Sequence, residues 1–193
     1  MADSLARTAV SPLLLAAGLS SGVEHDAAFT ALYESHLGRV YSFVRSHVRS
    51  AGEAHELVGR IFVKVYAHWP QAPRGDAAVL WLFRVARNTV IDYWRREGRK
   101  ELVSVALDEL EELPDQSRDP EGQYASKQRK ALLLEAVSEL DPNSRMLLAL
   151  KFTAQRTNRE IAAILQVSEA AVSMRLLRAL RRLRERLAGR GVR

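Results

Sequence analysis

Residues 81–96 read WLFRVARNTVIDYWRR, and the apolar side chains in this stretch recur every three or four positions. That spacing is typical of an amphipathic helix with one buried side. We predict a helix from about Ala77 to Arg96. Its inward stripe would consist of Val79, Leu82, Ala86, Thr89, Val90 and Tyr93. The other side of this helix is rich in arginine, and its last turn ends on two more arginines.

The preceding residues predict two further helices that could bury their apolar sides against this one. The first begins at Asp26 and would place inward Phe29, Leu32, Tyr33, His36, Val40, Phe43, Val44 and His47. The second would place inward Ala54, Leu57, Val58, Ile61, Phe62, Val65 and Tyr66. Pro70, Pro73 and Gly75 break the chain before the third helix. No alternating strand pattern appears in the sequence, so the predicted fold class is all-α.

The C-terminal part of the chain predicts a helix-turn-helix. Asp141 is a suitable N-cap with Pro142 at the first helical position, and a short apolar helix would follow over residues 145–152. Thr157 and Glu160 have the spacing of a capping box at the start of the next helix. The buried side of that helix would consist of Ile161, Ala162, Ile164 and Leu165.

A final helix is predicted after a tight turn at residues 166–167, with Ser168 as its N-cap. Its inward side would consist of Val172, Leu176, Leu180 and Leu183. Its outward side would consist of Glu169, Ala170, Ser173, Arg175 and Arg178. Two short helices joined by such a turn match the arrangement in which the second helix enters the major groove of DNA.

Charge is unevenly distributed along the 193 residues, whose formal net charge is +6. Residues 101–125 contain one basic and eight acidic residues, whereas the segments on either side carry an excess of lysine and arginine. An acidic segment rich in turn-forming residues is typical of a solvated linker. We therefore predict a disordered extension over residues 1–23, a helical domain over 24–100, an acidic flexible linker over 101–125 and a second helical domain over 126–193.

Composition argues against several classes of function. The chain has no cysteine, which excludes disulfides, thiolate metal sites, iron–sulfur clusters and a thiol nucleophile. Its five histidines are scattered without metal-ligand spacing, and its acidic residues cluster only in the linker. No apolar run approaches the roughly 18 residues of a membrane-spanning helix. Residues 10–19 resemble a secretory signal only faintly, because Pro12 interrupts a short apolar run.

Each basic feature also has a plainer interpretation. Arg95 and Arg96 would suit a solvated helix end, and the second block could be an ordinary helical hairpin with a basic tail. Trp81 and Trp94 could stack on unpaired bases, although the apolar run around Trp81 favours a core position. Competing functions are a one-component regulator with a ligand pocket, a nuclease with clustered carboxylates, and an adaptor that lacks two DNA-reading surfaces.

Residues 81–96, together with Arg159-Glu160-Ile161-Ala162 and the helix from Val172 to Arg184, resemble bacterial sigma factors. The chain is similar to the extracytoplasmic-function (ECF) group of the sigma-70 superfamily over about residues 26–97 and 127–188. The first domain would then be sigma region 2 and the second sigma region 4. Such a factor binds core RNA polymerase, recognises the −35 and −10 promoter elements and helps to melt the −10 region. The resemblance implies a cytoplasmic, non-catalytic, DNA-binding initiation subunit without a cofactor.

The resemblance also assigns contacts to individual residues. For the −10 element it implies Arg74, Asp76, Arg84, Arg87, Asn88, Asp92, Arg95 and Arg96. For the −35 element it implies Arg159, Ser168, Glu169, Ala170, Ser173, Arg175 and Arg178. For the β′ clamp helices of core polymerase it implies Glu56, Leu57, Arg60, Ile61 and Lys64. The second domain would also contact the β flap, and an anti-sigma factor is a further partner that the family suggests.

Two segments depart from the family pattern. Residues 54–60 read AHELVGR where the family usually has AEDLVQE, which removes or reverses polar groups expected near the polymerase. Residues 171–175 read AVSMR where TVKSR is usual, and Gln166 stands at the usual turn glycine. We therefore expect the polymerase contacts and the −35 sequence preference to differ in detail from those of relatives.

Overall fold

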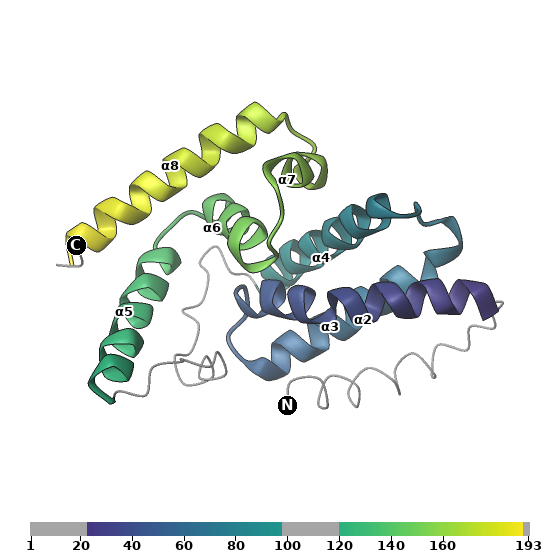
Figure 1. Cartoon of the computed structure of the whole chain (residues 1–193), viewed down its shortest axis with the longest axis horizontal. Helices are drawn as coiled ribbons and strands as arrows, with labels where there is room; N and C mark the ends of the chain where they lie inside the picture. The colour runs from purple at the N-terminus through teal and green to yellow at the C-terminus, as the bar shows by residue number, and fades with distance from the viewer. Residues whose placement is uncertain (1–22, 98–119, 191–193) are drawn as a thin grey trace.

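The computed structural model describes residues 23–97 and 120–190, which we call the first half and the second half (Figure 1). The first half contains α2 (Val23–Arg45), α3 (Ala51–Ala67), the short 3-10 helix η1 (Trp69–Gln71) and α4 (Asp76–Arg96). The second half contains α5 (Pro120–Ser138), α6 (Pro142–Leu148), the π-helical turn η3 (Ala149–Thr153), α7 (Asn158–Leu165) and α8 (Glu169–Ala188). No strand occurs in either half, which confirms the predicted all-α class.

The first half forms because α2, α3 and α4 bury the apolar stripes that the sequence places on them. Phe43, Phe62 and Leu82, one from each helix, are fully buried at the centre. Ser50 begins α3 with a capping box, in which its hydroxyl accepts from the Glu53 amide and the Glu53 carboxylate accepts from the Ser50 amide. A capping box satisfies amide groups that would otherwise lack partners at the helix start.

Aromatic side chains close one end of the first half. Phe29 packs edge-on against Tyr66 at 4.8 Å and against Trp69 at 5.7 Å between ring centroids, and Tyr33 packs against Phe62 at 4.8 Å. Such edge-to-face pairs add to the stability that area burial already provides. This cluster anchors η1, and with it the loop that leads into α4.

The predicted caps of the second half are confirmed. Asp141 accepts from the Ser144 amide at 3.0 Å. Thr157 and Glu160 form the expected capping box. Ser168 accepts from the Ala171 amide at 3.1 Å at the start of α8.

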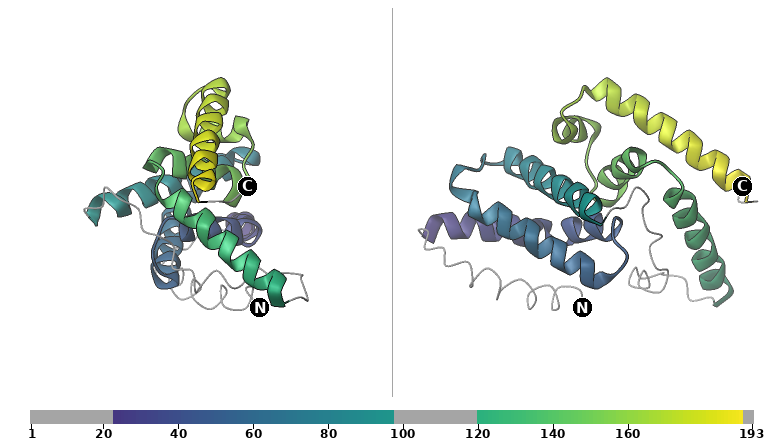
Figure 2. Two further views of the ribbon diagram at one scale, coloured as in Figure 1. Left: turned by 90° about the vertical axis from the view of Figure 1, so that its left-hand side faces the viewer. Right: turned by 180° about the vertical axis from the view of Figure 1, so that it is seen from behind.

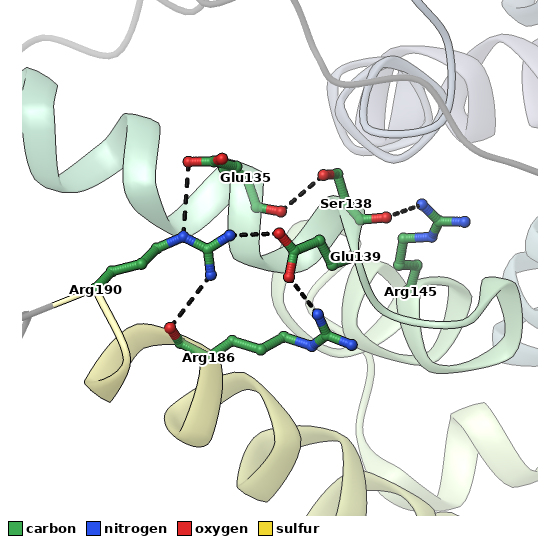
Figure 3. Close-up of polar contacts among 6 residues, drawn as sticks. All are labelled: Glu135, Ser138, Glu139, Arg145, Arg186 and Arg190. Carbon is green, nitrogen blue, oxygen red and sulfur yellow. Dashed lines mark hydrogen bonds and ion pairs between the residues drawn. The ribbon is translucent and has the colours of Figure 1, made fainter.

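Ion pairs join the two ends of the second half, where α5 lies beside the C-terminal end of α8 (Figure 3). Glu139 accepts hydrogen bonds from Arg190 and Arg186, which hold the pKa of its carboxyl below the usual range although partial burial acts in the opposite direction. Arg145, which is buried, donates to the Ser138 carbonyl at 2.5 Å. These contacts of Glu139, which directly follows α5, and of Arg145 in α6 therefore fix the far end of the second half.

Three details of the predicted pattern need correction. Leu180 is exposed and Ala179 is buried in its place, because two successive four-residue steps rotate a side chain away from the buried stripe. The helix expected over residues 145–152 gives way after Leu148 to the π-helical turn η3. Helix α5 begins at Pro120, a residue suited to the first helical turn, so the helix includes residues 120–125 of the predicted linker. The rest of that linker and the predicted N-terminal extension lie almost entirely outside the described residues.

The two halves are packed against each other. Helix α4 contacts α7, and α2 contacts η3. In Figure 1 α8 and the α2–α3 pair lie on opposite sides with α6 and α7 between them, and the view from behind in Figure 2 shows the same order. Buried apolar residues of both halves form one continuous core. We call this arrangement the closed arrangement.

Candidate nucleic-acid interface

The polar side of α4 carries most of the residues expected at the −10 element. Asn88, Arg95 and Arg96 are exposed, and Asp92 is partly exposed. Arg95 pairs with Asp92 at 3.0 Å, and Arg87 donates to the Asn88 side-chain oxygen at 3.1 Å. These short-range pairs orient the guanidinium and amide groups on one side of a rigid helix. Such groups bind phosphate oxygens and base edges in nucleic-acid complexes.

The loop before α4 presents the other two residues expected at the −10 element. The Arg74 guanidinium lies 5.9 Å from the centre of the Trp69 ring, and Trp69 itself is buried in the aromatic cluster. Gly75 has φ of +58°, a conformation that favours glycine, and the next residue is the exposed Asp76 at the start of α4. The loop is therefore held at its base while its charged side chains face outward.

Arg84 occupies a different environment from its neighbours on α4. Its guanidinium donates to the Ala163 carbonyl of α7 at 2.9 Å, so it contacts the second half. Phe83 beside it is fully buried, and the Arg156 guanidinium of the second half lies 5.0 Å from the Phe83 ring centre. The sequence pattern identified neither partner, because each contact joins residues more than 70 positions apart.

Trp94 serves the first half as a structural residue. Its indole nitrogen donates to the His47 carbonyl at 3.2 Å, and its ring stacks on the His47 imidazole at 5.4 Å. Burial lowers the pKa of His47 from 6.5 to about 4, with a smaller contribution from the positive charge of Arg145 and an opposing one from the bond to the Phe43 carbonyl. His47 is therefore neutral near pH 7.

The N-terminal part of α8 is open to solvent, as the sequence pattern predicts. Its outward residues are all exposed: Glu169, Ala170, Ser173, Arg175 and Arg178. Ser168 caps the helix, and Arg159 is exposed at the start of α7. All seven residues expected at the −35 element therefore lie at or near the helix-turn-helix surface that can face a DNA groove.

A polar chain that the sequence analysis missed fixes the relation of α7 to α8. Lys151 donates to the Asn158 side-chain oxygen at 2.9 Å, and the Asn158 amide donates to the Ser173 hydroxyl at 3.0 Å.

Glu160, in the same helix as Asn158, has a lowered pKa even though burial acts to raise it, because Thr157 and Arg156 donate hydrogen bonds to its carboxylate. The negative charge of Glu160 is therefore maintained beside the buried Arg156.

The residues expected at the polymerase contact separate into two sets. Glu56, Arg60 and Lys64 follow one another at four-residue steps on the outer side of α3, where Arg60 pairs with Glu56 at 2.7 Å. Leu57 and Ile61 are 1% and 0% exposed, inside the core of the first half. We therefore revise the expectation for these two residues, whose side chains support the fold and are not available at the surface.

The described residues offer neither a metal-binding cluster nor a membrane-spanning helix. In the part of the chain that the structure describes, no group of histidine and carboxylate side chains is arranged to hold a metal ion. Within residues 23–97 and 120–190, no helix combines the length and the apolar character that a membrane span requires.

A helix-turn-helix packed beside a helical unit with an arginine-bearing helix defines a DNA-binding protein of two parts. Comparison with known families identifies both parts. Residues 32–100 match Sigma-70 region 2, and residues 136–185 match Sigma-70, region 4. The RNA polymerase sigma-E factor of Streptomyces avermitilis is 32% identical over 138 residues, which cover 72% of this chain and 73% of that protein. The ECF RNA polymerase sigma factor SigM of Bacillus subtilis is 31% identical over 162 residues, covering 83% and 95%.

Solved structures show the same fold. The structure of CnrH in complex with the cytosolic domain of CnrY matches with a TM-score of 0.61 at 22% identity, over 96% of each chain. RpoE from Bartonella quintana, solved with the anti-sigma factor NepR, matches with a TM-score of 0.61 at 21% identity, over 83% of this chain and 96% of RpoE. The chain belongs to the sigma-70 family, in its ECF group. It is a sigma factor, which acts in promoter-specific initiation of transcription by RNA polymerase.

Proposed function

We propose that the two halves divide promoter recognition between them. Helix α4 and the loop over residues 72–76 would hold the melted strand of the −10 element, while α8 would enter the major groove of the −35 element. The observation that carries this proposal is the combination of an exposed polar side on α4 with a fully exposed outward side on the N-terminal part of α8. Guanidinium groups would neutralise phosphates, and Asn88 and Ser173 could pair with bases.

The proposed partner of the first half is the pair of β′ clamp helices of core polymerase. Glu56 and Lys64 are exposed and Arg60 between them is partly exposed, so the three form a charged stripe on α3 that a helical partner of complementary charge could contact. The second half would meet the β flap. Since RpoE of Bartonella quintana was solved with an anti-sigma factor, an anti-sigma partner is proposed for this chain as well. The protein would work in the cytoplasm as a binding subunit without catalysis of its own.

Promoter binding would require the closed arrangement to open. Promoter elements about 25 base pairs apart lie roughly 85 Å apart along a duplex. Helices α4 and α7 touch in the closed arrangement, and Arg84 is held by the Ala163 carbonyl of α7. The two DNA-facing surfaces could reach separate promoter elements only after these contacts part.

Transcription in vitro tests the proposed function directly. The full-length protein and core RNA polymerase would be incubated with genomic DNA, and the transcription start sites would be mapped. We expect initiation at a defined set of promoters that requires both components, together with poor DNA binding by the protein alone. Tight binding to a duplex operator without association with core polymerase would instead support the one-component regulator.

Two substitutions test the division of labour between the halves. Asn88→Ala should impair open-complex formation, because a base contact contributes about 1–3 kcal/mol, while leaving binding to a −35 duplex intact. Asn88 suits this purpose because it is exposed and its side-chain oxygen is bonded to Arg87 of the same helix. Arg159→Ala should weaken −35 binding. It should also reduce by about one the slope of the logarithm of the binding constant against the logarithm of the salt concentration, which we call the salt slope. Arg184→Ala, an exposed change farther along α8, is the matched control and should leave the slope unchanged.

A further inference from the structure

A cavity of about 380 Å³ lies between the two halves. Arg87, Ile91 and Trp94 of α4 form one wall, and residues of α6 and α8 form the other. The polar side chains that decide its chemistry are Arg87, Asp141, Ser144, Arg175, Arg178 and Arg182. The cavity therefore exists only while the halves are closed, since neither half alone supplies both walls.

The lining of this cavity carries an excess of positive charge. Four arginines face one carboxylate, that of Asp141. Asp141 is already engaged, because it accepts from Arg182 at 3.0 Å and from the hydroxyl and amide of Ser144. The hydrogen bonds from Ser144 and the Arg182 charge lower the pKa of Asp141 against the opposing effect of burial. Among the residues that line the cavity, Asp141 is the one acidic residue, so no second carboxylate of the lining can pair with the other three guanidiniums.

These three guanidiniums have free hydrogen-bonding capacity. In the described part of the chain, Arg175 and Arg178 have no hydrogen-bond or ion-pair partner. Arg87 donates one N–H to Asn88, and its Nε is buried without a partner. A buried donor without a partner is unfavourable, and like charges gathered around one cavity repel each other. The closed arrangement therefore brings together donors and charges that an anion would satisfy.

Phosphate fits this set of donors. A guanidinium presents a planar fork of N–H groups that binds two phosphate oxygens at once. Donors from opposite walls suit an anion with several linked phosphates, because one phosphate can meet Arg87 while another meets Arg175 or Arg178. The volume lies within the range of small-molecule sites in proteins, about 300–1,000 Å³.

We propose that this cavity binds a small polyphosphate anion, which bridges α4 to α8 and stabilises the closed arrangement. The consequence for transcription rests on the proposed function. Arg87, Arg175 and Arg178 are also expected to contact promoter phosphates, so the anion and the promoter compete for the same guanidiniums. The anion would hold the sigma factor in a form that cannot span the promoter.

The distance between the halves provides a test that needs neither polymerase nor promoter. The chain has no cysteine, so Ala67→Cys and Ala188→Cys, both at exposed positions, allow two dyes to be attached to the full-length protein. Energy transfer would be followed while sodium tripolyphosphate is added, with sodium chloride adjusted to keep the ionic strength constant. We expect a saturable increase in transfer, and calorimetry on the unlabelled protein should give the same half-saturation.

Charge-reversal variants separate a bridging site from general attraction. Arg175→Glu and Arg87→Glu, one on each wall, should each raise the half-saturating concentration by at least about tenfold. Arg184→Glu makes the same change in net charge on an exposed part of α8 that does not line the cavity, and it should leave half-saturation unchanged. Equal weakening by all three substitutions would overturn the proposal, because it would show non-specific attraction.

Three further ligands, two nucleotides and an acidic peptide, identify what the cavity recognises. Adenosine and guanosine triphosphates should act like tripolyphosphate, because the linked phosphates are the recognised group. A response to the nucleotides alone would overturn the assignment to the phosphate chain. Closure by an acidic peptide, without a response to tripolyphosphate, would overturn the proposal in favour of a protein partner. Failure of the proposed sigma activity would appear only in the transcription experiment. Failure of the proposed anion site would appear in the energy-transfer and calorimetry experiments, so the two failures are distinguishable.

Discussion

His47 is fully buried and lies just after the end of α2. Its Nδ1 bonds to the Phe43 carbonyl at 2.8 Å, its ring stacks on Trp94, and its Nε2 has no partner. Protonation would add a charge inside the core and near the Arg145 guanidinium. The side chain is therefore stable in the fold only as the neutral imidazole.

This burial predicts a loss of stability in mild acid. Because burial lowers the pKa of His47 from 6.5 to about 4, the folded state takes up fewer protons than the unfolded state in that range. The contribution is fully present above pH 6.5 and is lost as the pH falls toward 4. We expect the free energy of unfolding to decrease by about 2 kcal/mol between pH 7.5 and pH 5 from this group alone. Urea denaturation at each pH measures it.

His47→Gln is the matched variant for that measurement. Glutamine can keep a hydrogen bond to the Phe43 carbonyl but does not titrate, so the difference in slope between the two proteins isolates His47. His36, whose pKa is also lowered by burial, contributes equally to both proteins and cancels. Parallel pH profiles for the two proteins would show that His47 does not carry this dependence.

At the scale of elements, the turn between α7 and α8 determines how the proposed recognition helix is presented. Gln166 ends α7 with φ of +56° and ψ of +47°, and the Val167 amide returns to the Ala162 carbonyl at 3.1 Å. This left-handed conformation is unfavourable for residues other than glycine. The turn keeps its shape because the cap at Ser168 and the polar chain from Lys151 to Ser173 hold both helices.

Gln166→Gly should therefore stabilise the protein. Removing the strain of a left-handed non-glycine residue should increase the free energy of unfolding by roughly 0.5–1 kcal/mol, less the entropy that glycine adds to the unfolded chain. Ala170→Gly, in the first turns of α8, is the control and should decrease it, because glycine is unfavourable inside a helix. Thermal unfolding of both variants gives the comparison, and a lower melting temperature for Gln166→Gly would contradict the strain argument.

The elements that the sequence predicted well are those specified by neighbouring residues. The caps at Asp141, Thr157 and Ser168 act over three positions, so their residue types are sufficient to locate them. The same holds for the buried stripe of α4, which follows from spacing alone. Leu57 and Ile61 show the limit of assigning contacts by family resemblance. The periodicity of α3 predicted that both side chains point into the core, whereas the family resemblance predicted that they contact the polymerase. The structure confirms the position in the core.

The relation between the halves could not be predicted from the sequence. Arg156 and Phe83 are 73 positions apart, and neither belongs to a pattern that would suggest the other. An arginine in a basic segment is expected at the surface, yet Arg156 is only 7% exposed. Its burial is possible because Ala154, Glu160 and the Phe83 ring together satisfy the guanidinium. Such compensation depends on tertiary structure and has no local signal.

Arg156 is therefore the residue on which we expect the closed arrangement of the whole molecule to depend most. A desolvated cation–π contact contributes about 2 kcal/mol, so Arg156→Ala should shift the balance between closed and open forms by roughly 30-fold toward the open form. Arg159→Ala, three positions away at an exposed site, removes the same charge and is the control. X-ray scattering should show a larger radius of gyration for Arg156→Ala alone. The helical content should stay unchanged, because the capping box at Thr157 does not require Arg156. Equal radii for the two variants would mean that the apolar contacts of α4 with α7 hold the halves together without this arginine.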